Sequence, residues 1–223
     1  MSFKKNKYTV ILQAISKDLA SFIANYFSMQ KQVYDTCRAA RYFSPFETIL
    51  GYYEGKDEQI PNTYSQYSNM AMETLLLKCQ PGMEKATGLK LYPAYTYARI
   101  YKKGDELKRH KDRFSCEIST TMNLAGDDWP IYLSPNENVG LSETEGGKKG
   151  ITSFSNAKGI KVDLNPGDML VYRGQELEHW REKFKGKECV QVFLHYNNRK
   201  TPGAKDNMFD KRPHLGLPSW FKR

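Results

Sequence analysis

The chain has 223 residues, of which 39% are hydrophobic and 13% aromatic, which is typical of a globular protein and excludes a disordered one. No apolar run approaches the roughly 18 residues that a membrane-spanning helix needs, so no membrane partner is expected. The net charge of +9 admits a nucleic-acid partner, although residues 91–196 are nearly neutral, with 16 Lys and Arg against 15 Asp and Glu.

The N-terminal segment and the cysteines both bear on the cellular compartment. The first 20 residues combine basic side chains with a short apolar run, but charges return at once and no small-residue cleavage site follows, so no signal peptide is indicated. Cys37, Cys79, Cys116 and Cys189 are widely spaced and form no C-x-x-C pair, which argues against a disulfide framework and against a zinc knuckle. We therefore expect a protein of the reducing cytoplasm.

Residues 1–90 are expected to be mainly helical. The segment SKDLASFIANYF begins at Ser16, which is placed to cap a helix, and its apolar residues recur at helical spacing. A second helix is expected over residues 69–79, NMAMETLLLKC, followed by Pro81 and a short turn.

From residue 91 onward the sequence changes to short segments rich in β-branched and aromatic residues, separated by Gly, Pro, Asn or Asp. Such segments are typical of strands. Eight of them are expected, at 94–101, 116–124, 129–133, 151–155, 160–164, 168–174, 177–182 and 188–197. Eight short strands after a helical lead-in predict an α+β fold, a double-sheet jelly roll with N-terminal helices packed outside it.

This pattern predicts one domain over residues 1–223. Residues 1–90 would form its helical support region, residues 91–196 its jelly-roll core, and residues 197–223 a basic C-terminal tail. The tail carries 7 Lys and Arg against 2 Asp and Glu. Such a charge run is more often a solvated surface than a binding groove.

The stretch GDELKRHKD places His110 two residues before Asp112. Residues i and i+2 of a strand point to the same face, so this imidazole and this carboxylate can lie side by side. His179 is the candidate third ligand, because it follows a Pro-Gly-Asp turn and a strand. Two histidines and one carboxylate on one side of a metal form the facial triad of non-haem Fe(II) oxygenases. The competing interpretation is a surface histidine in a basic stretch, with Asp112 paired to an arginine.

At these two motifs the chain resembles a known family. YKKGDELKRHKD is similar to the stretch around the first two iron ligands of prolyl 4-hydroxylase-like Fe(II)/2-oxoglutarate dioxygenases, and NPGDMLVYRGQELEHW to the stretch that leads to the third. The resemblance covers residues 91–196. It implies a double-stranded β-helix, a form of jelly roll, with iron ligands at His110, Asp112 and His179. It also implies decarboxylation of 2-oxoglutarate to succinate and CO₂, coupled through O₂ to hydroxylation of a C–H bond, with ascorbate in support.

The resemblance places a tyrosine, here Tyr101, on the distal carboxylate of 2-oxoglutarate. A buried carboxylate also needs a cation, but the family's usual position for it falls on Cys189, which cannot supply one. Arg99 shares strand parity with Tyr101 and is the favoured replacement, since a solvated arginine is unexpected between its apolar neighbours. Lys187 is the alternative, because it shares parity with Cys189.

Arg113 and Arg181 lie beside the metal motifs and are expected on the substrate side. There they would bind an acidic group or pair with Glu117 and Glu182. No catalytic residue is expected beyond the three metal ligands. The resemblance favours a prolyl or other residue of a peptide or protein as the substrate.

Three rival interpretations stay open. A nucleic-acid dealkylase of the same chemistry would carry paired arginines on the strand after the third ligand, whereas this strand, ECVQVFLHYNNRK, has none before Arg199. A non-catalytic jelly roll that docks through its basic tail is favoured by Cys189. A cupin-type isomerase would need further histidines, and neither His195, at the far end of the last strand, nor His214, in the tail, is expected at the site.

Overall fold

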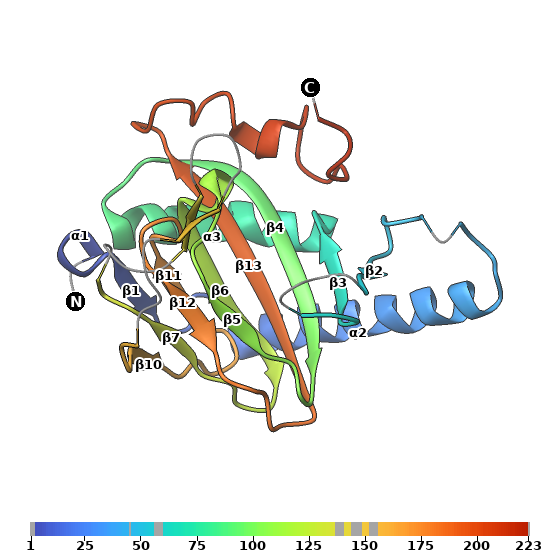
Figure 1. Cartoon of the computed structure of the whole chain (residues 1–223). Helices are drawn as coiled ribbons and strands as arrows, with labels where there is room; N and C mark the ends of the chain where they lie inside the picture. The colour runs from blue at the N-terminus through green and yellow to red at the C-terminus, as the bar shows by residue number, and fades with distance from the viewer. Residues whose placement is uncertain are drawn as a thin grey trace.

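The computed structural model describes residues 3–44, 46–55, 60–136, 141–143, 149–151 and 156–222 (Figure 1). Along the chain its elements are α1 (Phe3–Asn6), β1 (Tyr8–Ile11), α2 (Lys17–Ala39), β2 (Tyr52–Tyr53), β3 (Tyr64–Tyr67), α3 (Met70–Thr87), β4 (Leu91–Lys102), β5 (Leu107–His110), the 3₁₀ turn η1 (Phe114–Cys116), β6 (Ile118–Gly126), β7 (Ile131–Leu133), β8 (Leu141–Glu143), β9 (Lys149–Ile151), β10 (Ile160–Val162), β11 (Met169–Tyr172), β12 (His179–Arg181), β13 (Glu188–Asn198) and the turn η2 (Met208–Lys211).

Two antiparallel sheets form the double-stranded β-helix that the sequence predicted. The larger has the strand order β1-β11-β6-β13-β4-β3-β2 and the smaller β10-β7-β12-β5, while β8 and β9 pair with each other. Strand residues alternate between the two faces of the large sheet. On β4 and β13, even-numbered residues such as Ala98 and Val192 join the core cluster that contains the helices. Odd-numbered residues point to the other face. Apart from Ile151, the strand expected over 151–155 lies outside the described residues.

The helices cover one face of the large sheet (Figure 1). Ser16 caps α2 as predicted, since its hydroxyl accepts a hydrogen bond from the N–H of Leu19. The first 90 residues are less helical than expected, because β1, β2 and β3 extend the large sheet at both of its edges. β1 pairs with β11, with Tyr8 opposite Tyr172, and thereby satisfies backbone groups that would otherwise form an exposed edge.

Helix α3 does not end before Pro81 but continues to Thr87, where Gly88 follows in the left-handed conformation, with φ of 73°. A proline inside a helix costs about 3 kcal/mol relative to alanine. Here the proline is exposed, while Leu76 and Met83 on either side of it are fully buried. Burial of these side chains against the sheet therefore outweighs the cost of a proline inside the helix.

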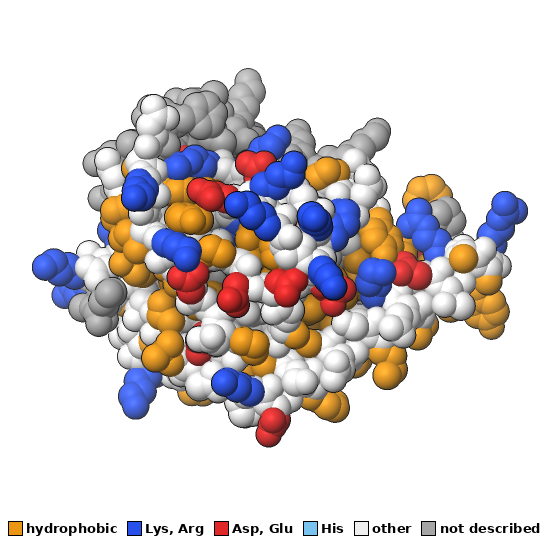
Figure 2. All heavy atoms as spheres, turned by 90° about the horizontal axis from the view of Figure 1, so that it is seen from below, with side chains coloured by type: hydrophobic (Ala, Val, Ile, Leu, Met, Phe, Trp, Pro, Cys, Tyr) orange, Lys and Arg blue, Asp and Glu red, His pale blue; other side chains and the backbone are white. Residues whose placement is uncertain are grey.

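The C-terminal tail is not the solvated surface that its charge predicted. The guanidinium of Arg212 is fully buried and lies 2.7 Å from a carboxylate oxygen of Glu73 on α3. It also donates to the carbonyl of Ala94 on β4. The tail is therefore packed against the fold through buried polar contacts. On the opposite side of the molecule, seen from below, basic and acidic side chains are interspersed (Figure 2). No helix in the described part of the chain has the length and apolar character to cross a membrane.

Candidate metal centre

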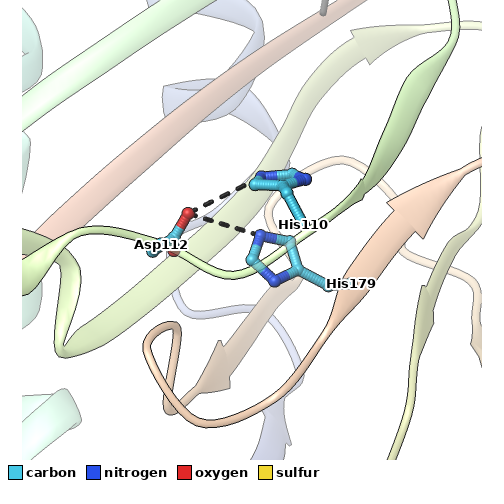
Figure 3. A group of neighbouring side chains, drawn as sticks. All are labelled: His110, Asp112 and His179. Atoms are coloured by element: carbon cyan, nitrogen blue, oxygen red, sulfur yellow. Dashed lines mark ion pairs between the residues drawn. The ribbon is translucent and has the colours of Figure 1, made fainter. Parts of the chain in front are cut away.

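The three side chains predicted as metal ligands lie together where β5 ends and β12 begins (Figure 3). His110 and His179 are opposite each other in the β5–β12 pairing. Oδ1 of Asp112 lies 3.6 Å from Nε2 of His110 and 3.5 Å from Nε2 of His179. The two imidazole rings are 4.2 Å apart, centre to centre. Two strands and one loop therefore bring three ligand atoms to one point.

Each imidazole is oriented by a backbone carbonyl on its other side. Nδ1 of His110 lies 2.7 Å from the carbonyl oxygen of Lys108, and Nδ1 of His179 lies 3.0 Å from that of Leu177. Because a carbonyl oxygen only accepts, each Nδ1 carries the hydrogen and donates it. When the rings are neutral, this arrangement turns the lone pairs of Nε2 toward Asp112, and it is the tautomer that binds a metal through Nε2.

The charges in this cluster depend on one another. Burial disfavours the ionised form of Asp112, but His179 and His110 hold the pKa of its carboxyl well below the usual range. Burial likewise disfavours charging of His179, but the Asp112 carboxylate raises the pKa of this imidazole above its ordinary value. A negative oxygen in this buried position thus needs a positive neighbour, which a divalent cation would supply.

Ser119 and Gly174 shape the surroundings of Asp112, and the sequence predicted neither role. The hydroxyl of Ser119 donates to Oδ2 of Asp112 at 2.8 Å, which leaves Oδ1 toward the imidazoles. A Cβ at Gly174 would overlap Oδ2 of Asp112 and the carbonyl oxygen of Cys116, and would lie 2.7 Å from the Ser119 hydroxyl. The carbonyl of Gly174 accepts the backbone N–H of Asp112 at 2.9 Å. Only glycine allows this close approach.

A cavity of 210 Å³ opens beside the three ligands. Alternation along β4 brings its odd-numbered residues to one wall, and β13 contributes another part. The remaining lining residues are Tyr95, Tyr97, Arg99, Tyr101, Leu107, Cys116, Tyr172, Phe193 and His195. The candidate metal ligands thus face a largely aromatic chamber.

Arg181 lies between the two sheets, with its side chain fully buried. Its guanidinium donates to Oγ1 of Thr121 at 3.0 Å, to Oε1 of Gln191 at 3.4 Å and to the carbonyl of Trp129. Among the described residues, Nε has no hydrogen-bond partner and no carboxylate pairs with this cation. Burial lowers the pKa of Arg181. A buried cation without a counter-ion is costly, which is expected where an anionic ligand binds.

Of the three residues predicted to bind 2-oxoglutarate, Tyr101 and Arg99 line the cavity and Lys187 does not. Arg99 donates to the hydroxyl of Tyr97 at 3.2 Å, and its guanidinium lies 4.9 Å from the centre of that ring. Lys187 is exposed in the turn between β12 and β13, where its backbone N–H donates to Asp127. Lys187 precedes β13, which begins at Glu188, so strand parity with Cys189 does not bring this lysine inside.

The two arginines expected on the substrate side do not form the ion pairs considered for them with Glu117 and Glu182. Arg113 does not pair with Glu117 but forms two hydrogen bonds to Asp210, at 2.7 and 3.0 Å. Arg181 is not one of the residues that line the cavity, and it has no ion pair with Glu182 within the described ranges. Both side chains are directed by contacts with segments distant in the sequence.

Sequence reasoning placed His195 away from the site, but the structure places it in the cavity wall. Its Nδ1 lies 3.0 Å from the Ser119 hydroxyl, and its ring stacks on Tyr95 at 4.5 Å. Ligand atoms of His195, Cys116 and Asp112 lie within 4.8 Å of one another. On β13, Phe193 and His195 are two residues apart and therefore point to the same face. This spacing could have identified His195 from the sequence.

No family model and no curated protein matches the chain. Among solved structures, it is similar to the non-heme alpha-ketoglutarate-dependent epimerase SnoN from nogalamycin biosynthesis, with a TM-score of 0.62 and 10% identity, covering 97% of this chain and 90% of that one. A prolyl hydroxylase from Trichoplax adhaerens, in complex with a hypoxia inducible factor peptide fragment, gives a TM-score of 0.56 and 11% identity, covering 89% of this chain and 86% of that one. A prolyl-4-hydroxylase from Pseudomonas putida gives 0.50 and 15%, covering 88% and 95%.

At these identities the likeness is one of fold. It agrees with the sheet topology and with the resemblance predicted from the two sequence motifs. The chain therefore has the double-stranded β-helix fold of prolyl 4-hydroxylase-like Fe(II)/2-oxoglutarate dioxygenases.

Proposed function

We propose that this protein is an Fe(II)- and 2-oxoglutarate-dependent dioxygenase that hydroxylates a C–H bond. The observation that carries the proposal is the convergence of two Nε2 lone pairs and one carboxylate oxygen beside an open cavity. Two imidazoles and one carboxylate suit Fe(II) and leave positions for other ligands. When bound, iron would supply the activation of O₂, with decarboxylation of 2-oxoglutarate to succinate and CO₂ providing electrons.

Tyr101 and Arg181 are the residues we propose for the distal carboxylate of 2-oxoglutarate. Cys189 is opposite Tyr101 in the β13–β4 pairing, and the charge of Arg181 is close enough to affect the pKa of both side chains. The cation that the family resemblance would place at Cys189 would thus come from β12, a strand of the smaller sheet. The place of Arg181 beside Cys189 favours this assignment over Arg99, which is the second candidate because it lines the same cavity.

A prolyl or other residue of a peptide or protein is the substrate we propose. The aromatic side chains of Tyr95, Tyr97 and Phe193 give the cavity a wall that suits an apolar side chain and excludes water. One structure of similar fold holds a peptide. This chain's own residues would thus bind the co-substrate on one side and orient a C–H bond on the other.

The rival functions are less well supported by the described residues. A nucleic-acid dealkylase is not favoured, because β13, the strand after the third ligand, carries no arginine. A non-catalytic jelly roll drew its support from the missing cation at Cys189, but Arg181 supplies a buried cation beside that position.

Two measurements on purified protein test the proposal. Under anaerobic conditions, adding 2-oxoglutarate to the Fe(II)-loaded protein should change its visible absorption spectrum. In air with ascorbate, the protein should then form succinate. His179→Ala is the control and should abolish both responses. If 2-oxoglutarate leaves the Fe(II) spectrum unchanged and no succinate forms, the proposed function is wrong and a binding jelly roll is favoured.

A further inference from the structure

The loop that carries Asp112 is held by a carboxylate from the C-terminal tail. Asp210 is 2% exposed in its side chain and accepts two hydrogen bonds from Arg113, at 2.7 and 3.0 Å. It also accepts the hydroxyl of Ser115 at 2.6 Å and that of Tyr67 on β3 at 2.7 Å. Lys222 lies 3.4 Å away. Asp210, almost 100 residues further along the chain, thus accepts hydrogen bonds from the side chains of Arg113 and Ser115, which follow Asp112.

The backbone that delivers this carboxylate is strained. Phe209, Asp210 and Lys211 have φ values of 56°, 55° and 66°, so three consecutive residues that are not glycine adopt the left-handed conformation. This conformation is disfavoured for side chains with a Cβ, and it persists only where surrounding contacts compensate for it. The bonds of Asp210 supply such contacts. The strain and the bonds together place the carboxylate against Arg113.

The contacts of Arg113 lead directly to the candidate metal centre. Arg113 follows Asp112 in the chain, and its guanidinium lies 4.6 Å from the centre of the Tyr95 ring in the cavity wall. On its other side, Asp112 is held by Gly174 and Ser119. The metal-ligating carboxylate therefore lies between two supports, and Asp210 provides one of them.

We propose that Asp210 is a positioning residue of the metal centre. By binding Arg113 and Ser115, it fixes the loop that presents Asp112. The C-terminal tail therefore helps to position a metal ligand. The inference rests on the metal site proposed above. It gives Arg113 a role in orienting a ligand, in place of the substrate contact predicted from the sequence.

The same tail contains a matched control. Arg212 lies two residues past Asp210 and pairs with Glu73 at 2.7 Å, with both side chains buried. This pair joins the tail to α3, and within the described part of the chain it has no hydrogen bond or ion pair with residues 111–117. Replacing Glu73 therefore loosens the tail but leaves the bonds from Arg113 and Ser115 to Asp210 in place.

The experiment compares Co²⁺ binding by the full-length protein and its variants, with Co²⁺ as an air-stable probe for Fe(II). Asp210→Asn should raise the dissociation constant for Co²⁺ about 10- to 100-fold, as changes in groups that orient metal ligands do. It should also alter the visible spectrum of the bound Co²⁺. Glu73→Gln should change neither, although both variants lower the thermal midpoint. Arg113→Ala, which alters a partly exposed side chain, should reproduce most of the loss, and the double variant should lose less than the sum of the two single losses.

Each outcome decides a different point. If the wild-type protein binds Co²⁺ and both Asp210→Asn and Arg113→Ala bind it equally well, the positioning role is wrong and the metal site stands. Equal losses in Glu73→Gln and Asp210→Asn would also overturn it, because the tail would then act only through overall stability. Failure of the wild-type protein to bind Co²⁺ would overturn both the metal site and this inference. If Asp210→Asn does not fold, Arg113→Ala alone decides.

Discussion

Replacing Arg181 by methionine should separate the stability of the protein from its binding of 2-oxoglutarate. The guanidinium is fully buried, pairs with no described carboxylate and has an Nε without a partner. Exchanging buried charged groups for apolar side chains is often neutral or stabilising, by about 1–4 kcal/mol. Against this gain, Thr121, Gln191 and the carbonyl of Trp129 lose a donor, at about 1–3 kcal/mol for each group left unsatisfied. The variant is therefore expected to be less stable, so its response to 2-oxoglutarate is compared with its own midpoint without ligand.

Binding of the co-substrate should suffer much more. A hydrogen bond to a charged group contributes about 1.5–3 kcal/mol. At 1.4 kcal/mol for each factor of ten, losing the cation should raise the dissociation constant of 2-oxoglutarate about 100-fold. At a concentration of about 100 times the wild-type constant, 2-oxoglutarate stabilises the wild-type protein by about 2.7 kcal/mol and the variant by only about 0.4 kcal/mol.

Scanning calorimetry of the Co²⁺-loaded protein, with and without 2-oxoglutarate, measures this difference. For a chain of this size, about 1 kcal/mol shifts the thermal midpoint by about 2–4 °C, so the wild type should gain about 5–10 °C and Arg181→Met about 1 °C. Arg99→Met, which changes the other cavity-side arginine, is the matched control and should keep most of the shift. The reasoning is refuted if Arg181→Met keeps the full shift and Arg99→Met loses it, because Arg99 would then be the cation.

Three further predictions concern single contacts. Gly174→Ala should weaken Co²⁺ binding at least about tenfold, because the added Cβ overlaps the Asp112 carboxylate; a calorimetric titration with an unchanged dissociation constant would contradict the close approach. Pro81→Ala should raise the free energy of unfolding by up to about 3 kcal/mol, seen as a higher urea midpoint, and an unchanged midpoint would show that the proline costs nothing in this helix. Burial opposes ionisation of Asp168, yet the backbone N–H groups of Gln13 and Asn165 hold its pKa below the ordinary value. Its contribution to stability is therefore present above the unfolded pKa of about 3.9 and lost as the pH falls through the lower folded value. Urea unfolding at a series of acidic pH values should show a shallower loss for Asp168→Asn, and parallel curves would exclude this group.

Most of what could be predicted from the sequence came from the spacing of residues over short distances, such as the two-residue alternation of a strand. The alternation of strand residues and the spacing of turns predicted the jelly roll, and a two-residue spacing was enough to pair His110 with Asp112. The same parity argument put Arg99 and Tyr101 on one wall of the cavity, where the structure has them. It did not apply to Lys187, because this residue lies in the charged turn before β13 and its side chain is exposed.

Tertiary structure alone decided which distant residues complete the site. Arg181 is a candidate for the co-substrate because β12 faces β6 and β13 across the barrel and supplies its guanidinium beside Cys189. Asp210 reaches the Asp112 loop because the tail folds back over that end of the sheet. Neither contact can be predicted from residue spacing in the sequence, since each joins segments that become neighbours only when the strands have paired. A short stretch of sequence specifies the face of the sheet to which a side chain points. Which residue it contacts on that face depends on how the whole chain folds.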